Sequence, residues 1–416
     1  MIQAFGSAGY EIVSFDEKAD IYIVNTCTVT NMSDKKSRQI LRQAKKNNVN
    51  AIIVAVGCYV QVAKKEIENI PEIDLAIGTN KKIDIVNLVE TYILKKESEE
   101  YITDDVMQNK FYGDFGSVTY TEKTRAVIKV QDGCDRFCSY CIIPYARGRI
   151  RSRQPEKVIE EIKQISQNGI KEVVITRINV ASYGKVFENE YRLIDLLEEI
   201  NKINGIERIR LGSIEPLLLT EEFINRLIKL EKICHHFHLS LQSGCTETLK
   251  RMNRRYTAEE FKEIVQRIRT VYSDVILTTD IIVGFPGETD EEFENTYAFL
   301  KDINFYKMHI FKYSPRKGTK AEMMENQVKG DIKEKRSKIL LELSDENEIE
   351  YQKAYIGKKV EALFEEKDGE YYKGHTANYI MVKAKSENDI SNKMYTVQIK
   401  DIDEKDKTME GVLVSV

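Results

Sequence analysis

Three closely spaced cysteines are the residues of this chain best suited to metal chemistry. Cys134, Cys138 and Cys141 lie in the run QDGCDRFCSYC, which has the spacing CxxxCxxC. A structural zinc site normally has four protein ligands, so three thiolates would leave it one ligand short. A [4Fe–4S] cluster held by three thiolates keeps one iron open to a small molecule. The spacing therefore favours an iron–sulfur cluster over a zinc knuckle without its fourth ligand or a chance grouping of cysteines.

Two further cysteines each follow directly on an expected strand. Ile21–Thr26 and Ala51–Gly57 are short apolar runs rich in β-branched residues, as buried parallel strands are, and Asp34–Lys46 between them is typical of a charged helix. Cys27 and Cys58 come next in sequence after these strands. Ligands of open α/β sheets bind beyond the carboxyl ends of the strands, so these cysteines are candidates for a second metal site. Buried structural thiols are the alternative.

The middle of the chain predicts a partial, open (βα)6 barrel. From Thr124 onward, six apolar runs alternate with amphipathic helices such as Pro155–Gln167 and Glu221–Leu230. The active site of such a barrel lies at the carboxyl ends of its strands, where the motifs GSIEP, QSGC and GFPGET follow the third, fourth and fifth runs. The expected strands are Arg125–Val130, Glu172–Thr176, Glu207–Leu211, His236–Leu241, Val275–Val283 and Tyr306–Tyr313.

The last part, from about Gly357 to Val416, has the pattern of a small antiparallel β-barrel with polar turns. It holds ten Lys, no Arg and twelve Asp and Glu, so its composition alone does not establish RNA binding. A polar stretch near Lys95–Asp114 is expected to be a linker.

The overall composition limits the kind of partner and the compartment. The net charge of the 416 residues is −4, which argues for a local rather than a general nucleic-acid surface. Seven cysteines, three of them within eight residues, do not form a secreted disulfide framework. Because no run has the length of a membrane span and the first residues lack a signal-peptide pattern, we expect a soluble, cytoplasmic protein without membrane contact.

The motifs NTCTVTN, CSYCIIPYARGRIRSR and HLSLQSGCTETLKRMNRRY together resemble the radical S-adenosylmethionine (SAM) methylthiotransferases. The resemblance covers essentially the whole chain and implies an N-terminal cluster domain at 1–100, a radical-SAM core at 120–350 and a TRAM domain at 353–416. The motifs are most similar to the branch that converts N6-threonylcarbamoyladenosine at position 37 of tRNA to its 2-methylthio derivative. The sister branch, which acts on isopentenyladenosine, usually has Glu in place of Ile150 and Ser in place of Cys245. A branch acting on a ribosomal protein and a non-catalytic, zinc-containing RNA-binding protein are further alternatives.

The resemblance implies two [4Fe–4S] clusters and SAM as cofactors. Cys134, Cys138 and Cys141 would hold the cluster that binds SAM and would be the catalytic cysteines. Cys27 and Cys58 match the second and third ligands of the auxiliary cluster. The first ligand belongs to an opening segment that this sequence lacks, so we expect an N-terminally truncated form without the first strand, in which the auxiliary cluster is in doubt. The other residues expected to contact SAM are Tyr140, Glu215, Gln242, Asp280, Gly284 and Gly287.

Arginines after the cysteine loop are candidates for tRNA phosphate contacts, and solvated surface charge is the alternative. They are Arg147, Arg149, Arg151 and Arg153, and Lys250, Arg251, Arg254 and Arg255 form a second basic group. Arg177 stands where the family usually has glycine, and it could either pair with the SAM carboxylate or crowd the sulfonium.

The run His236–Gln242 alternates polar and apolar side chains, so its polar side should line the barrel lumen. A histidine metal site there is disfavoured, because no carboxylate or cysteine partner is evident at ligand spacing.

The expected partners are tRNA and an electron donor such as flavodoxin or ferredoxin, and the protein is expected to be a monomer.

Overall fold

The structure, a computed structural model, describes residues 1–95, 101–113, 116 and 124–414. The predicted domain limits at 100 and 120 and part of the predicted linker at 95–114 lie outside these residues. The chain divides into two compact units, each described by itself. The first comprises Met1–Ser117, Asp132–Arg151 and Ser314–Met323, and the second comprises Val118–Gln131, Ser152–Tyr313 and Met324–Val416.

A four-stranded parallel sheet forms the centre of the first unit. Its strands follow the order β1 (Ile21–Thr26), β2 (Ile52–Gly57), β3 (Leu75–Ile77) and β4 (Tyr101–Ile102). The first two confirm the predicted strands, whereas β3 and β4 were not predicted because they are only three and two residues long. In the register of β1 with β2, Thr26 pairs with Gly57. Cys27 and Cys58 therefore both follow the carboxyl ends of neighbouring strands.

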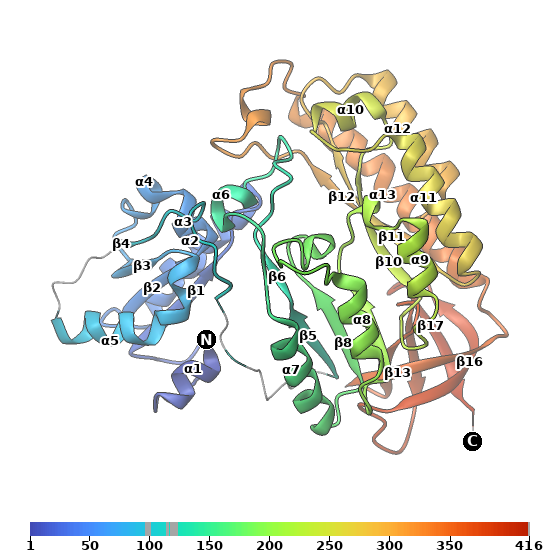
Figure 1. The fold of residues 1–416 in the computed structure, drawn as a ribbon, viewed down its shortest axis with the longest axis horizontal. Coiled ribbons are helices and arrows are strands. Elements are labelled where there is room, and N and C mark those ends of the chain that lie inside the picture. Colours follow the sequence, from blue (N-terminus) through green and yellow to red (C-terminus); the bar gives the residue numbers. More distant parts are fainter. Residues whose placement is uncertain (96–100, 114–115, 117–123, 415–416) are drawn as a thin grey trace. The chain divides into compact units, whose positions relative to one another are not determined.

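Helices cover both faces of this sheet (Figure 1). On one face, α2 (Asn31–Asn47) packs Leu41 and Ala44 in one buried cluster with residues of β1 and β2, and Thr30 caps this helix by accepting from the Ser33 amide at 3.1 Å. On the other face, α1 (Ile2–Ser7) and α5 (Ile85–Lys95) pack against β2 and β3. The remaining elements of this unit are α3 (Cys58–Val62), α4 (Lys64–Ile67), η1 (Asn80–Asp84), α6 (Ile143–Arg147) and η4 (Lys320–Met323).

The second unit contains the six strands predicted for the partial barrel. Two three-stranded parallel sheets, β5-β8-β9 and β10-β11-β12, are joined by isolated bridges between Ile209 and Ile233 and between Ile214 and Leu239. The strands are β5 (Arg125–Lys129), β8 (Glu172–Thr176), β9 (Arg208–Leu211), β10 (His236–Gln242), β11 (Ile276–Val283) and β12 (Lys307–Lys312). Their apolar side chains and those of the helices form one large core.

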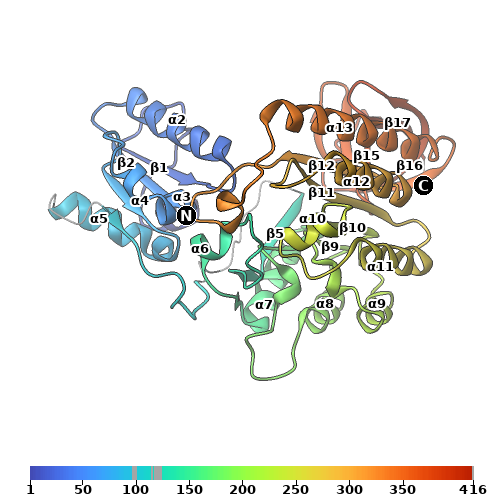
Figure 2. The ribbon, with the colours of Figure 1, turned by 90° about the horizontal axis from the view of Figure 1, so that it is seen from above.

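Helices lie along the outer side of these strands (Figure 2). Three begin at threonine caps, and α11 and α12 carry capping boxes in which Glu260 and Glu292 bond back to Thr257 and Thr289. No helix in the described part of the chain is both long and apolar enough to cross a membrane. The helices are α7 (Pro155–Gln167), α8 (Leu193–Asn201), α9 (Glu221–Leu227), α10 (Thr246–Arg251), α11 (Ala258–Val271), α12 (Asp290–Ile303) and α13 (Gly330–Lys353), with the short 3₁₀ helices η2 (Val180–Ser182) and η3 (Pro216–Leu218) between them. Before α7, the short strands β6 (Gln131–Asp132) and β7 (Arg151–Ser152) pair with each other.

The C-terminal residues form the expected closed barrel, in the order β13-β14-β15-β17-β16. Its pairs are antiparallel except β15 with β17, which is parallel, with Val382 opposite Met409. Residues 371–385, which the sequence pattern alone would predict as one continuous strand, form two strands, because the chain turns at Tyr379, whose φ is 71°. The strands are β13 (Lys359–Asp368), β14 (Tyr371–Thr376), β15 (Met381–Lys385), β16 (Met394–Asp403) and β17 (Thr408–Leu413).

Two buried arginines of β9 join this barrel to the rest of the second unit. Arg208 donates to the carbonyl oxygens of His375 at 2.9 Å and Glu361 at 3.2 Å. Arg210 donates to the carbonyl oxygen of Ala377 at 3.1 Å and forms an ion pair with Glu172 at 2.7 Å. The guanidinium groups thus donate to main-chain oxygens of β13, of β14 and of the turn after β14.

Candidate active site

The cysteine loop lies in the first unit and presents three partly exposed thiols without a disulfide. The amide of Cys141 donates to the carbonyl oxygen of Cys138 at 2.9 Å. The amide of Cys134 donates to the carbonyl oxygen of Gly148 at 3.0 Å. Tyr140 is half-buried in the same loop. Three accessible thiols on one short loop fit the donor set of a [4Fe–4S] cluster with one open iron.

Close backbone contacts fix the conformation of this loop. Gly133 has φ 72°, and a Cβ atom at this position would lie 1.8 Å from the carbonyl oxygen of Arg149. Phe137, between the first two cysteines, has φ 49°, which is uncommon for a residue other than glycine. Its ring lies under the Arg149 guanidinium at 5.1 Å and contacts Tyr145 edge to face. Strained residues of this kind persist where the surroundings hold them, and they cluster at functional sites.

Arg147 links the cysteine loop to the cysteine that follows β2. Its Nε–H donates to the sulfur of Cys58 at 3.0 Å, and its Nη1 lies 3.5 Å from Asp132. Burial lowers the pKa of Arg147, but the negative charges of Cys58, Asp132 and Cys27 outweigh burial and raise the pKa overall. Cys58 is buried at the start of α3, which packs against α6, and Cys27 is exposed. Both candidates for the auxiliary cluster therefore lie within the electrostatic reach of one arginine.

The residues expected to contact SAM through polar groups lie in the second unit, with Glu215 after β9, Gln242 at the last position of β10 and Asp280 within β11. Glu215 is buried and accepts from Nη2 of Arg254 at 2.9 Å. Gln242 has φ 77° at the irregular end of β10, a strained position that fits a functional role. Asp280 lies beside His238, with 3.2 Å between Oδ2 and Nε2.

The two glycines of the GFPGET loop both have positive φ, 69° for Gly284 and 76° for Gly287. A Cβ atom on Gly284 would lie 2.3 Å from Cγ of Lys333, so close packing of α13 already requires a glycine there.

Two residues that were not predicted from the sequence, Glu288 and Arg336, fix this loop. Glu288 accepts from the Gly284 amide at 3.0 Å and from Arg336 at 2.6 Å, and burial raises the pKa of Glu288 despite the arginine. The glutamate of the GFPGE motif could have indicated this role.

The four arginines proposed for phosphate contacts are not equivalent. Arg151 and Arg153 have side chains only 4% and 6% exposed, and they pair with Asp132 and Glu161. The prediction that these two contact phosphate is at odds with the structure, since their charges are already neutralised inside the protein. Arg147 donates to Cys58, whereas the side chain of Arg149 is half exposed, so Arg149 stays a candidate for a phosphate contact.

The second basic group is also partly internal. Arg251 pairs with Glu292 and donates to the carbonyl oxygen of Pro286 at 3.2 Å, and Arg254 is buried against Glu215. Arg177, in contrast, directly follows β8 and has a buried Nε atom without a hydrogen-bond partner.

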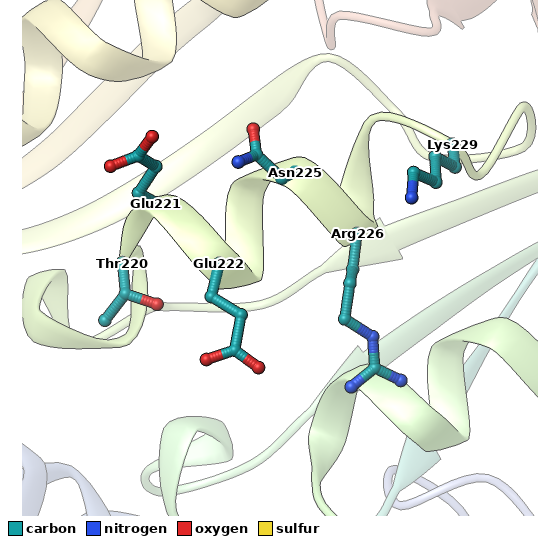
Figure 3. Close-up of a pocket in the computed structure, with 6 residues that line it drawn as sticks. All are labelled: Thr220, Glu221, Glu222, Asn225, Arg226 and Lys229. Atoms are coloured by element: carbon teal, nitrogen blue, oxygen red, sulfur yellow. The ribbon is translucent and has the colours of Figure 1, made fainter.

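None of these residues lines a hollow on the surface of α9 (Figure 3). Arg226 in this hollow is already paired with Asp195 at 2.6 Å and Glu198 at 2.8 Å, which leaves little free charge for a ligand. We therefore assign it no functional role. Its lining residues are Thr220, Glu221, Glu222, Asn225, Arg226 and Lys229.

The parallel barrel strands and the three-cysteine loop define a radical-SAM fold, and comparison with known proteins agrees. Residues 128–300 match the Radical SAM superfamily, and residues 1–78 match the uncharacterized protein family UPF0004. A solved structure of the radical SAM methyltransferase TsrM from Kitasatospora setae aligns over 72% of this chain and 66% of that chain, with a TM-score of 0.54 and 18% identity, which is evidence for the fold alone.

Curated relatives resemble the chain over nearly its whole length. The threonylcarbamoyladenosine tRNA methylthiotransferase MtaB of Bacillus subtilis is 39% identical over 95% of this chain and 89% of its own length. MtaB of Aquifex aeolicus is 41% identical over 91% of each. The tRNA-2-methylthio-N(6)-dimethylallyladenosine synthase of Clostridium botulinum is 37% identical over 94% of this chain and 88% of its own length. The chain belongs to the radical-SAM tRNA methylthiotransferases, a family of enzymes that use SAM and [4Fe–4S] clusters.

Proposed function

We propose that this enzyme transfers a methylthio group to C2 of N6-threonylcarbamoyladenosine at position 37 of tRNA. The similarity to the two MtaB proteins, over at least nine-tenths of the chain, carries this proposal. The reaction replaces a C–H bond of an aromatic ring that is not acidic, so a radical must remove the hydrogen. A cluster at Cys134, Cys138 and Cys141 would bind SAM at its open iron and supply the electron that produces the radical.

The protein's own groups would then hold SAM and the substrate in place. Tyr140 beside the cluster is suited to the adenine, while Glu215 and Gln242 offer oxygens to the ribose and amino groups of SAM. Glycines at 284 and 287 let the backbone approach the adenosine closely. Cys27 and Cys58 would hold the auxiliary cluster, with Arg147 stabilising the thiolate of Cys58 through its donated hydrogen bond.

The proposed partners follow from this chemistry. A reductant such as flavodoxin or ferredoxin would deliver the electrons, and the tRNA substrate would place the enzyme in the cytoplasm. That the enzyme acts as a monomer is a separate part of the proposal. The exposed part of Arg149 is the remaining candidate among the loop arginines for a tRNA phosphate contact.

Nucleoside analysis of tRNA from a deletion strain tests the proposed function. We expect the 2-methylthio derivative of threonylcarbamoyladenosine to disappear, and to return with the wild-type gene but not with Cys138→Ala. The 2-methylthio derivative of isopentenyladenosine should stay unchanged. Loss of that derivative instead would assign the enzyme to the branch of the Clostridium botulinum relative and overturn the proposal.

A further inference from the structure

A second group of ligand-type side chains lies on three adjacent strands of the second unit. His238 is on β10, Asp280 on β11 and His309 on β12. The strand register brings them together, because His238 pairs with Thr278 and Asp280 pairs with His309. One imidazole or carboxylate atom of each residue lies within 4.8 Å of the others. Among the residues that the structure describes, this is the one such group of three or more.

The spacing of the first two side chains already suits a metal ion. Nε2 of His238 and Oδ2 of Asp280 are 3.2 Å apart. Two ligand atoms at bonds of about 2.0–2.1 Å in a tetrahedral site are about 3.3–3.4 Å apart. His309 is exposed, and its ring centroid lies 5.7 Å from that of His238. A nitrogen of His309 nevertheless lies within 4.8 Å of the ligand atoms of the other two residues.

A hydrogen-bonded group behind His238 holds its ring in the orientation that a metal ligand requires. Oγ1 of Thr278 lies 3.0 Å from Nδ1 of His238 and 3.0 Å from Nε2 of His236, which is buried. The hydroxyl can accept from one imidazole and donate to the other. Nδ1 of His238 is thus engaged, and Nε2 is left facing Asp280. Metal-binding histidines are normally held in this way through their second nitrogen.

We propose that His238, Asp280 and His309 bind one divalent transition-metal ion, separate from both cysteine sites. Two imidazoles and one carboxylate are a ligand set for Zn²⁺ and Fe²⁺, and they leave positions open for water or another ligand. The sequence argued against a histidine metal site because it showed no carboxylate partner, and the structure supplies Asp280. Asp280 is then a metal ligand rather than a SAM contact. The proposal does not depend on which nucleoside the enzyme modifies.

Zinc binding by the full chain tests this proposal. The protein, with its iron–sulfur clusters reconstituted without oxygen, is freed of loosely bound metal on a chelating resin, dialysed against Zn²⁺ and analysed for zinc and iron. We expect one zinc ion per chain, and a loss of affinity of about 100-fold or more in His309→Ala. Thr278→Val keeps the three ligands and the shape of the residue, and it should weaken binding by about 10- to 100-fold.

His235→Ala is the matched control, since His235 also pairs with a carboxylate, Asp274, at 2.7 Å, but lies outside the group. It should bind zinc as the wild type does. X-ray absorption should show nitrogen and oxygen ligands near about 2.0–2.1 Å and no sulfur near about 2.3 Å. Absence of bound zinc, equal binding by His309→Ala and the wild type, or sulfur ligation would each overturn the proposal. None of these results depends on tRNA modification.

Discussion

Arg147 donates a hydrogen bond from Nε to the sulfur of Cys58 at 3.0 Å. The arginine ends α6, the short helix after the cysteine loop, and the cysteine begins α3, directly after β2. One side chain therefore couples the three-cysteine loop to a candidate ligand of the auxiliary cluster. Since both lie in the first unit, this coupling is a property of one compact body.

Removal of the Arg147 charge should weaken iron binding at Cys58. In Arg147→Gln the thiolate loses a charge-assisted hydrogen bond, so we expect the iron near Cys27 and Cys58 to be lost several-fold faster to a chelator. Timed iron release from reconstituted protein measures this. Arg149→Gln is the control, because Arg149 is half exposed and pairs with Asp135 at 3.6 Å. Identical release from the two variants would contradict the coupling.

Cys138→Ala should abolish reductive cleavage of SAM, because two thiolates cannot hold the cluster that binds it. The assay is 5′-deoxyadenosine formation with dithionite as reductant. Cys245→Ser should retain this activity, since Cys245 is a buried residue at the start of α10 outside the cysteine loop. Normal 5′-deoxyadenosine formation by Cys138→Ala would refute the assignment of the loop.

Arg210→Ala should destabilise the second unit strongly. Arg210 and Glu172 have side chains 4% and 1% exposed, so the variant leaves a buried carboxylate without its partner, at about 3–5 kcal/mol. Replacement of both residues, as in Arg210→Met with Glu172→Leu, should recover much of that loss. The shift in the denaturant midpoint measures both effects. A single variant as stable as the wild type would show that this ion pair does not hold the unit together.

Cys234 should resist alkylation in the folded protein. Burial raises the pKa of its thiol to about 11, although Arg210 acts in the opposite direction. At pH 8, three units below this value, on the order of 0.1% of the thiol is ionised, and only the thiolate reacts. Peptide mass spectrometry after iodoacetamide treatment of cluster-free protein should show labelling of the exposed Cys27 first. Equal labelling of both residues before denaturation would show that Cys234 is accessible.

The sequence predicted the six barrel strands because their apolar, β-branched runs are clear local patterns. It did not predict the meeting of His238, Asp280 and His309, because the register between strands depends on how the sheet assembles. The same limit applied to Arg153. The sequence placed it among closely spaced arginines suited to phosphate contacts, but it did not reveal that Glu161 on the next helix neutralises its charge. Local patterns thus identified the elements and the cysteine loop, whereas pairing between distant side chains required the structure.

The arginines of β9 also determine how this protein could be recombined with its relatives. Arg208 and Arg210 bond to main-chain oxygens of the C-terminal barrel at His375, Glu361 and Ala377. A chimera that exchanged only the residues after 353 would bring the main chain of a foreign β13, a foreign β14 and a foreign turn after β14 to these two guanidinium groups. β9 and the C-terminal barrel must therefore be transplanted together, so β9 belongs to the C-terminal module in any domain-exchange experiment.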